Sequence, residues 1–378
     1  MNTKALRPRP LRRASGFTLI ELLVGSALML FVIVAALSVY SKSNQISVDQ
    51  QQYTEIQHDV RSAMYLVMRD ARMAGSGIPE QFNMYAIDGV DNDPLVAAGQ
   101  VRPDRLILMG NMDDPLLLQI DTYGGAGAST PLILANGSFE QYPYLDADYV
   151  NRLILILPNP AAACRLGEVR QISAVTHPSG GMGETLTLNA GPTINLPSSK
   201  RLILTERLLG TCADTSNYHG GTVTLVDVKE YWLDVTGNYS GLTAGLNGYI
   251  GGGVGGVLYQ TKNGVHNPIA QNIENFQVEY NGDFNPDGLL DGFVPWNSLW
   301  TLTQVSSIRQ VRVQILGRTA NAFVSVSGRP TGNIYHYRRP GLSNSPGTTT
   351  DDRRRRFLLE STSNIRNLSL NIYNRGER

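Results

Sequence analysis

Oxygen-bearing side chains recur at alternate positions in the segment "GDFNPDGLLDG", residues 282–292. They are Asp283, Asn285, Asp287 and Asp291. These side chains fall at positions 1, 3, 5 and 9 of a calcium-binding loop, with Gly288 at the sharp turn and the Leu289 carbonyl at position 7. Position 12, where such a loop carries a bidentate carboxylate, is Val294. The segment therefore predicts a Ca²⁺ site that is weak or completed from elsewhere. The alternative is a solvated Asp/Asn/Gly turn.

A single acid inside an apolar run is the second chemical feature. From Phe17 to Tyr40 the only charged residue is Glu21. The preceding leader carries five cations and no acid: Lys4, Arg7, Arg9, Arg12 and Arg13. The run is long enough to cross a bilayer, and a charge placed in such a span is costly and by default functional. A plain anchor leaves Glu21 unexplained, and a cleaved secretory signal would have a shorter apolar stretch.

The chain has two cysteines, Cys164 and Cys212. If the apolar run is an anchor with its basic flank in the cytoplasm, both cysteines lie outside the cytoplasm. A lone pair in an oxidising compartment predicts one disulfide, which would stabilise the fold by about 4 kcal/mol in the chain-entropy account. The alternative is two buried free thiols.

A long helix must position Glu21. Beyond Tyr40 the chain becomes polar but keeps apolar residues at helical spacing. These residues are Ile46, Tyr53, Ile56, Val60, Ala63, Val67, Ala71 and Ala74. No proline interrupts residues 17–74, and Gly75 and Gly77 supply a stop, so one helix is predicted, apolar over 17–40 and amphipathic over 41–77. A coiled-coil dimer is the alternative for the second half.

From about residue 78 the pattern changes to short strand-like runs separated by turn residues. They cover 104–110, 115–121, 150–158, 168–176, 184–189, 201–208, 222–234, 256–262, 275–280, 309–319 and 356–374. Only 296–305 suggests a short helix. The predicted fold class is α+β: a cleaved leader over 1–16, the two halves of the helix, and a head over 78–378 built on a mainly antiparallel sheet.

Other patterns favour structural explanations. Removing the leader's cations leaves 27 basic against 32 acidic residues, which gives no support for nucleic-acid binding. "GGGVGG" at 251–256 precedes no helix and is interpreted as a glycine loop, and "DDRRRR" at 351–356 as a solvated strand edge. The histidines are scattered and no nucleophile motif is present, so we expect no enzyme activity and no small-molecule substrate.

The segment "GFTLIELLVGSAL" resembles the class III signal of type IV pilins and of type II secretion pseudopilins. The resemblance implies that a prepilin peptidase cuts after Gly16 and that Phe17 becomes the N-methylated first residue. Glu21 is then the fifth residue of the mature chain. Its carboxylate can meet the terminal amine of another subunit and fix the register between stacked helices, because leaving either charge unpaired in apolar surroundings is costly.

The segments "LVMRDARMAGSG", "VRVQILGRT" and "SNIRNLSL" are similar to those of PilW-type minor pilins, relatives of the GspJ pseudopilins. The resemblance implies a minor pilin that joins other minor pilins and the major pilin, primes assembly and stays near the pilus tip, with a tip adhesin as a further partner. It implies a single-pass inner-membrane protein with a periplasmic head, later part of a surface pilus. The alternatives are a minor pseudopilin of a type II secretion system and an anchored periplasmic enzyme or lectin.

Overall fold

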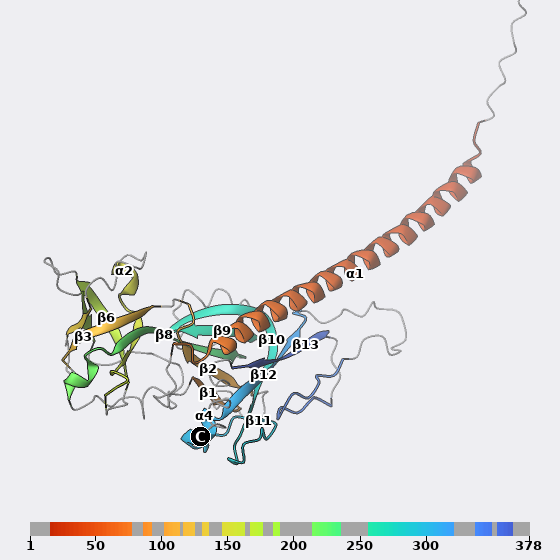
Figure 1. The fold of residues 1–378 in the computed structure, drawn as a ribbon. Helices are drawn as coiled ribbons and strands as arrows, with labels where there is room; N and C mark the ends of the chain where they lie inside the picture. Colours follow the sequence, from red (N-terminus) through yellow and green to blue (C-terminus); the bar gives the residue numbers. More distant parts are fainter. Residues whose placement is uncertain are drawn as a thin grey trace, which may run out of the picture. The chain divides into compact units, whose positions relative to one another are not determined.

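The computed structural model describes residues 16–77, 86–92, 102–113, 116–124, 131–135, 146–162, 167–176, 184–189, 214–235, 256–320, 337–349 and 354–365. The chain divides into two compact units, residues 1–52 and residues 53–378. Helix α1 (Leu19–Met73) contributes to both units (Figure 1). Its 55 residues confirm the predicted long helix, with bounds slightly inside the expected 17–74.

The second unit begins with the amphipathic part of α1. The side chains buried on this part include Ile56, Val60, Ala63, Val67 and Ala71. They belong to one hydrophobic core together with residues of the sheet. The predicted stripe is therefore correct from Ile56 onward, while Ile46 is 56% exposed. Since the sheet of the same chain covers this stripe, the fold itself accounts for the amphipathic pattern.

The helix ends at the predicted glycines and continues directly into contact with the sheet. Gly75 and Gly77 both have positive φ angles, which end the helix without strain. The Gly75 amide donates to the Met109 carbonyl at 2.8 Å, and the Asn111 amide donates to the Ser76 carbonyl at 2.7 Å. A Cβ at Gly110 would lie 2.9 Å from the Met73 carbonyl oxygen, so this close approach requires glycine.

An antiparallel sheet packs against this part of α1. Its strands, in spatial order, are β1 (Ile87–Val90), β2 (Arg105–Gly110), β8 (Thr222–Asp234), β9 (Gly256–Lys262), β10 (Val265–Gly282), β12 (Ile308–Arg318) and β13 (Arg356–Asn364). The short strand β11 (Phe293–Pro295) pairs with the end of β10. In Figure 1, β9, β10, β12 and β13 lie beside the C-terminal part of α1.

Six strands close into a separate antiparallel barrel. They are β3 (Leu117–Tyr123), β4 (Pro131–Leu134), β7 (Thr185–Leu188), β6 (Glu168–Thr176), β5 (Leu153–Leu157) and the first part of β8. The ring closes because β8 pairs with both β3 and β5. A second hydrophobic core, which includes Ile154, Ile172, Leu186 and Leu225, is built from these strands. The single antiparallel sheet expected from the sequence is thus correct in pairing direction but consists of two bodies that share β8.

Most predicted strands agree with the structure to within a few residues, whereas β1, β4 and β11 had no counterpart in the sequence patterns. The helix expected near 296–305 is confined to α4 (Leu302–Ser306), which Thr301 and Gln304 cap reciprocally. The short helices α2 (Asp146–Tyr149) and η2 (Thr215–Tyr218) were also not predicted. The strand predicted at 201–208 lies outside the described residues, as does the end of the one predicted at 356–374.

Candidate functional site

The predicted processing residues lie just before α1. Gly16 and Phe17 are non-helical and exposed, and apart from its chain neighbours no atom of the described residues lies within 4 Å of a Cβ built on Gly16. Thr18 caps the helix: its amide and hydroxyl donate to Glu21 Oε2 at 3.0 and 2.9 Å, and the Glu21 amide donates to Thr18 Oγ1 at 3.3 Å. This is a capping box, readable from Thr-x-x-Glu in the sequence and not recognised there. The acid in the apolar run thus has hydrogen-bond donors on its own helix.

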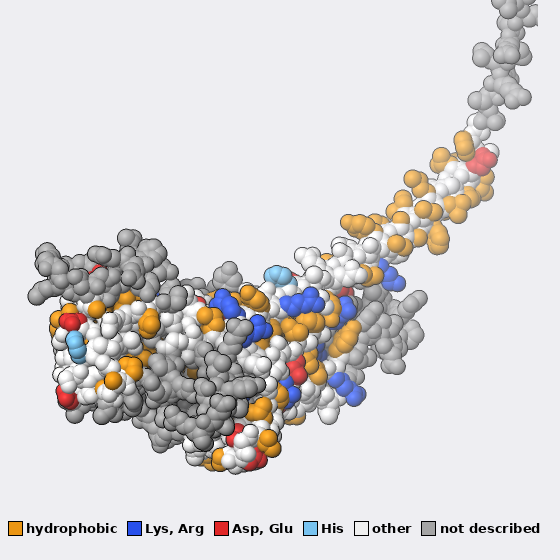
Figure 2. All heavy atoms as spheres, viewed as in Figure 1, with side chains coloured by type: hydrophobic (Ala, Val, Ile, Leu, Met, Phe, Trp, Pro, Cys, Tyr) orange, Lys and Arg blue, Asp and Glu red, His pale blue; other side chains and the backbone are white. Residues whose placement is uncertain are grey.

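The apolar half of α1 leaves its large side chains exposed (Figure 2). Phe17 is 86% exposed and Leu19 is 82% exposed, and the most apolar window of the helix buries none of its residues within the chain. The helix is long and apolar enough to span a membrane. A surface of this kind requires lipid or other apolar helices as its surroundings.

The predicted calcium loop is a compact turn whose carboxylates accept hydrogen bonds from the loop backbone. Asp283 accepts from the Asp287 and Gly288 amides at 3.1 and 2.9 Å. Asp291 Oδ2 accepts from the Phe284 amide at 2.6 Å. Within the described ranges no group of three or more His, Cys, Asp or Glu side chains is arranged to hold a metal ion. These bonds explain how the loop keeps its shape, and calcium binding stays a prediction.

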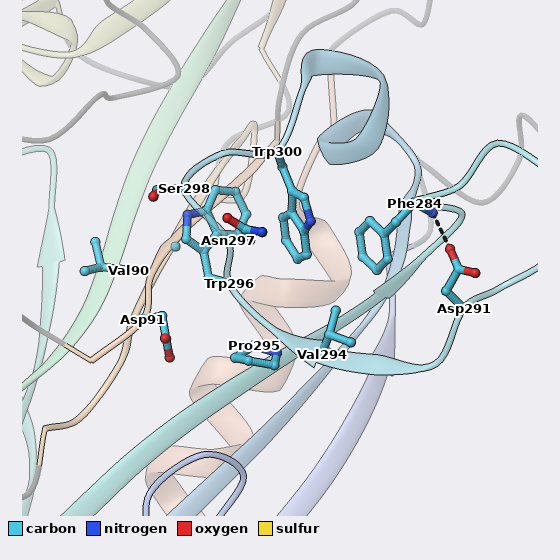
Figure 3. A pocket seen from close by; sticks show the side chains of 11 residues that line it. Val90, Asp91, Phe284, Asp291, Val294, Pro295, Trp296, Asn297, Ser298 and Trp300 are labelled. Carbon is cyan, nitrogen blue, oxygen red and sulfur yellow. Dashed lines mark hydrogen bonds between the residues drawn. The ribbon is translucent and has the colours of Figure 1, made fainter.

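An aromatic cavity of about 700 Å³ adjoins the loop (Figure 3). Its walls come from the end of β1, the loop after β10, strand β11 and the segment that follows β11. Phe284 stacks on Trp300 with ring centroids 4.4 Å apart, and Trp296 meets Trp300 edge-on at 5.2 Å. Asp291, a residue of the predicted calcium loop, also lines this cavity. Sequence reasoning missed the site, although two tryptophans in "WNSLW" were a visible signal.

Two carboxyl groups with raised pKa values lie close to the cavity in the chain: Asp88, which is partly buried and precedes Gly89, and Asp104, which is buried. Asp104 accepts hydrogen bonds from the Asn92 and Val278 amides at 3.0 and 2.9 Å. Burial, with a smaller contribution from the neighbouring Asp91, raises its pKa to about 8 against the opposing effect of these two bonds. Burial likewise raises the pKa of Asp88 to about 7. Both groups are therefore protonated over part of the neutral pH range.

A buried polar cluster fixes α1 to the sheet. Asp70 of α1 is fully buried, and its Oδ2 accepts hydrogen bonds from Tyr231 Oη at 2.6 Å and from Gln260 Nε2 at 3.0 Å. The same oxygen forms an ion pair with Lys229 Nζ at 3.1 Å. Lys229 also pairs with Asp113 at 3.0 Å. Partial burial raises the pKa of Asp113, but hydrogen bonds from Lys262 and Lys229 outweigh it and hold this pKa at about 2.

The predicted disulfide cysteines, Cys164 and Cys212, lie outside the described residues.

The arginine stretch at 351–356, interpreted above as a solvated strand edge, makes specific contacts in its described part. Arg355 lies over the Tyr53 ring at 4.2 Å, and Arg356 pairs with Glu274 at 2.5 Å. These arginines therefore contribute to packing of the second unit as well as to its surface charge.

The chain matches known proteins at both ends. Residues 253–367, which include β9 to β13, match the family model of the type IV pilus-assembly protein W, PilW. Residues 11–37 match the prokaryotic N-terminal methylation motif. No curated protein matches the chain significantly. Among solved structures, a type IV-like pilin from Thermus thermophilus matches at 13% identity over 57% of this chain and 84% of that one, with a TM-score of 0.21. The C-terminal part of the chain, with strands β9 to β13, is therefore similar to the type IV pilus-assembly protein PilW, and the N-terminal segment carries a prepilin-type methylation motif.

Proposed function

We propose that this protein is a minor pilin that assembles with other minor pilins, primes type IV pilus assembly and stays near the pilus tip. The observation that carries the proposal is the exposed apolar half of α1, which follows a processing motif and precedes a folded head. Such a helix can move from lipid into a bundle of pilin helices without meeting water. The size of the head supports a minor role, because a bulky head repeats poorly along a thin filament.

The N-terminal residues have defined roles in this proposal. A prepilin peptidase cuts after Gly16, and Phe17 is methylated on the new amine. The amide and the hydroxyl of Thr18 both donate hydrogen bonds to Glu21 Oε2. The second carboxylate oxygen, Oε1, has no donor among the described residues and can accept the terminal amine of a neighbouring subunit. Glu21 would then begin its own helix and set the register with the next one.

The proposed location follows from the same segment. Before assembly the apolar half of α1 crosses the inner membrane once, with the basic leader in the cytoplasm and the head in the periplasm. After assembly the protein is part of a pilus at the cell surface, in contact with the major pilin, other minor pilins and a tip adhesin.

Mass spectrometry of the chain from host membranes tests the processing step. The expected mature chain begins at methylated Phe17. A chain that begins at Met1, or that is cut beyond Tyr40, would contradict the filament proposal and favour an anchored periplasmic enzyme or lectin.

Complementation of a deletion strain tests the assembly step. The deletion should remove surface pili, and Glu21→Ala should leave membrane insertion intact while lowering recovery in sheared pili. Ser26→Ala is a matched control, since Ser26 bonds only to the Leu23 carbonyl within the same helix. Equal recovery of the Glu21→Ala and Ser26→Ala chains would contradict the register role. Loss of enzyme secretion with pili intact would identify a type II secretion pseudopilin instead.

A further inference from the structure

The cavity beside β11 combines aromatic rings with negative charge. Two of its eleven described lining residues are acids, Asp91 and Asp291, and none is Lys, Arg or His. Figure 3 shows the rings of Trp296, Trp300 and Phe284 between these two carboxylates. Indole faces attract cations through the ring quadrupole, and carboxylates add Coulomb attraction in the same direction. A cavity of this composition favours a cationic group and disfavours phosphate or carboxylate ligands.

A buried hydroxyl group lies next to two of the lining residues, Gly89 and Trp296. Tyr280 is fully buried, and its Oη has no hydrogen-bond partner among the described residues. A Cβ at Gly89, which lines the cavity, would lie 2.4 Å from this oxygen and 3.0 Å from Trp296 Cδ2. The absence of a side chain at Gly89 therefore allows Tyr280 and Trp296 to pack edge to face, with ring centroids 5.2 Å apart. Tyr280 thus supports the indole ring of Trp296 from the side of the core.

The residues beside the cavity indicate what kind of molecule carries the cation. Leu289 and Leu299 are 70% and 86% exposed, and each lies within two residues of a lining residue. Leu290, next to Asp291, is 46% exposed. A small ion would leave these leucines in water, whereas a protein surface placed over the cavity would cover them. The apolar surroundings thus favour a macromolecular partner.

We propose that this cavity, lined by Trp296, Trp300, Phe284, Asp91 and Asp291, binds a lysine or arginine side chain of a partner protein. The cation lies against the indole rings and near the carboxylates, and the exposed leucines form the surrounding apolar contact. The proposal goes beyond the pilus assignment, and its first test needs only the purified chain. Failure of this test therefore leaves the assembly experiments unaffected.

Tryptophan fluorescence reports directly on this cavity. The chain has three tryptophans, and Trp232 is 1% exposed and stacked on Tyr259. The other two line the cavity. The full-length chain is titrated in a polyoxyethylene detergent, which carries neither sugar nor ammonium, and in calcium-free buffer because Asp291 belongs to the predicted calcium loop. The probes are Nα-acetyl-lysine methylamide, its arginine counterpart and Nα-acetyl-norleucine methylamide, which has the apolar length of lysine without the charge.

The lysine and arginine probes should change the tryptophan emission until it saturates. The norleucine probe should bind with an affinity about tenfold lower. Asp91→Asn should lower the affinity for the lysine probe about threefold to tenfold and leave the affinity for the norleucine probe unchanged. Asp148→Asn is the control, because Asp148 is an exposed acid on α2. Circular dichroism confirms that each variant is folded. Equal binding of the lysine and norleucine probes, or no response to any probe, would overturn the proposal.

Discussion

Asp70 offers the most direct test of how α1 is held on the sheet. Its carboxylate is fully buried and receives donors from Tyr231, Gln260 and Lys229 of the sheet and from Arg69 of its own helix, at 2.6 to 3.1 Å. Asp70→Asn preserves the volume and one acceptor oxygen but removes the charge. The change therefore leaves the buried ammonium of Lys229 with one anionic partner fewer.

The expected loss of stability depends on the ionic partner that Lys229 keeps in the Asp70→Asn variant. Breaking a buried ion pair costs about 3 to 5 kcal/mol, because the remaining charge is left in a poorly solvated site. Lys229 is 1% exposed, but Asp113 stays 3.0 Å from its Nζ. We therefore expect the lower end of the range, a loss of about 3 kcal/mol in the free energy of unfolding. Lys229→Met should also destabilise the chain. In the double variant Asp70→Asn/Lys229→Met, the loss in the free energy of unfolding should be about 1 to 3 kcal/mol smaller than the sum of the losses in the two single variants.

The assay is urea unfolding of the purified full-length chain in non-ionic detergent, monitored by tryptophan fluorescence. Glu55→Gln is the matched control, since Glu55 is an exposed acid on the same helix and should change stability by less than about 0.5 kcal/mol. If Asp70→Asn costs no more than Glu55→Gln, or if the Asp70 and Lys229 changes are simply additive, the cluster does not hold the helix as argued.

Three further predictions concern pH, calcium and the cysteines. The pKa of Asp104 is raised to about 8, so folding binds a proton whose stabilising contribution is complete below about pH 4 and is lost as pH rises through about 8. In the parent chain the urea midpoint should fall between about pH 4 and pH 8, and Asp104→Asn should make this fall shallower. An unchanged slope would contradict this pKa. Millimolar Ca²⁺ should raise the melting temperature of the chain but not that of the Asp283→Asn/Asp287→Asn variant, and no response of the parent chain would reject the calcium site. Alkylation and peptide mapping without reductant should find Cys164 joined to Cys212, and two alkylatable thiols would reject the disulfide.

Local patterns allowed the helix and most strands to be predicted from the sequence. The apolar stripe from Ile56 to Ala74 and the stop at Gly75 depend on residues a few positions apart, and the structure agrees with both. The capping box at Thr18 and Glu21 is equally local and could have been identified. It was overlooked because Glu21 was considered only as a charge in an apolar run.

Features that depend on distant partners could not be predicted in the same way. The sequence pattern did not single out Asp70, because its burial depends on Tyr231 and Lys229 of β8. Closure of the barrel depends on β8 pairing with β3 on one edge and β5 on the other, which no local pattern encodes. The cavity likewise joins Gly89 to Trp296, residues far apart in the chain.

The shared strand β8 has a consequence for how such a head can change in evolution. β2 and β8 are antiparallel neighbours, and Gly110, the last residue of β2, is paired directly with Asp227 of β8. The whole barrel thus occupies the position of a loop between two hairpin strands. Replacing residues 111–226 by a two-residue Asn-Gly turn would join these ends without altering the order of any other strand. A lineage of these proteins can therefore gain, lose or exchange the barrel as a hairpin insertion while the α1-bound sheet keeps its topology.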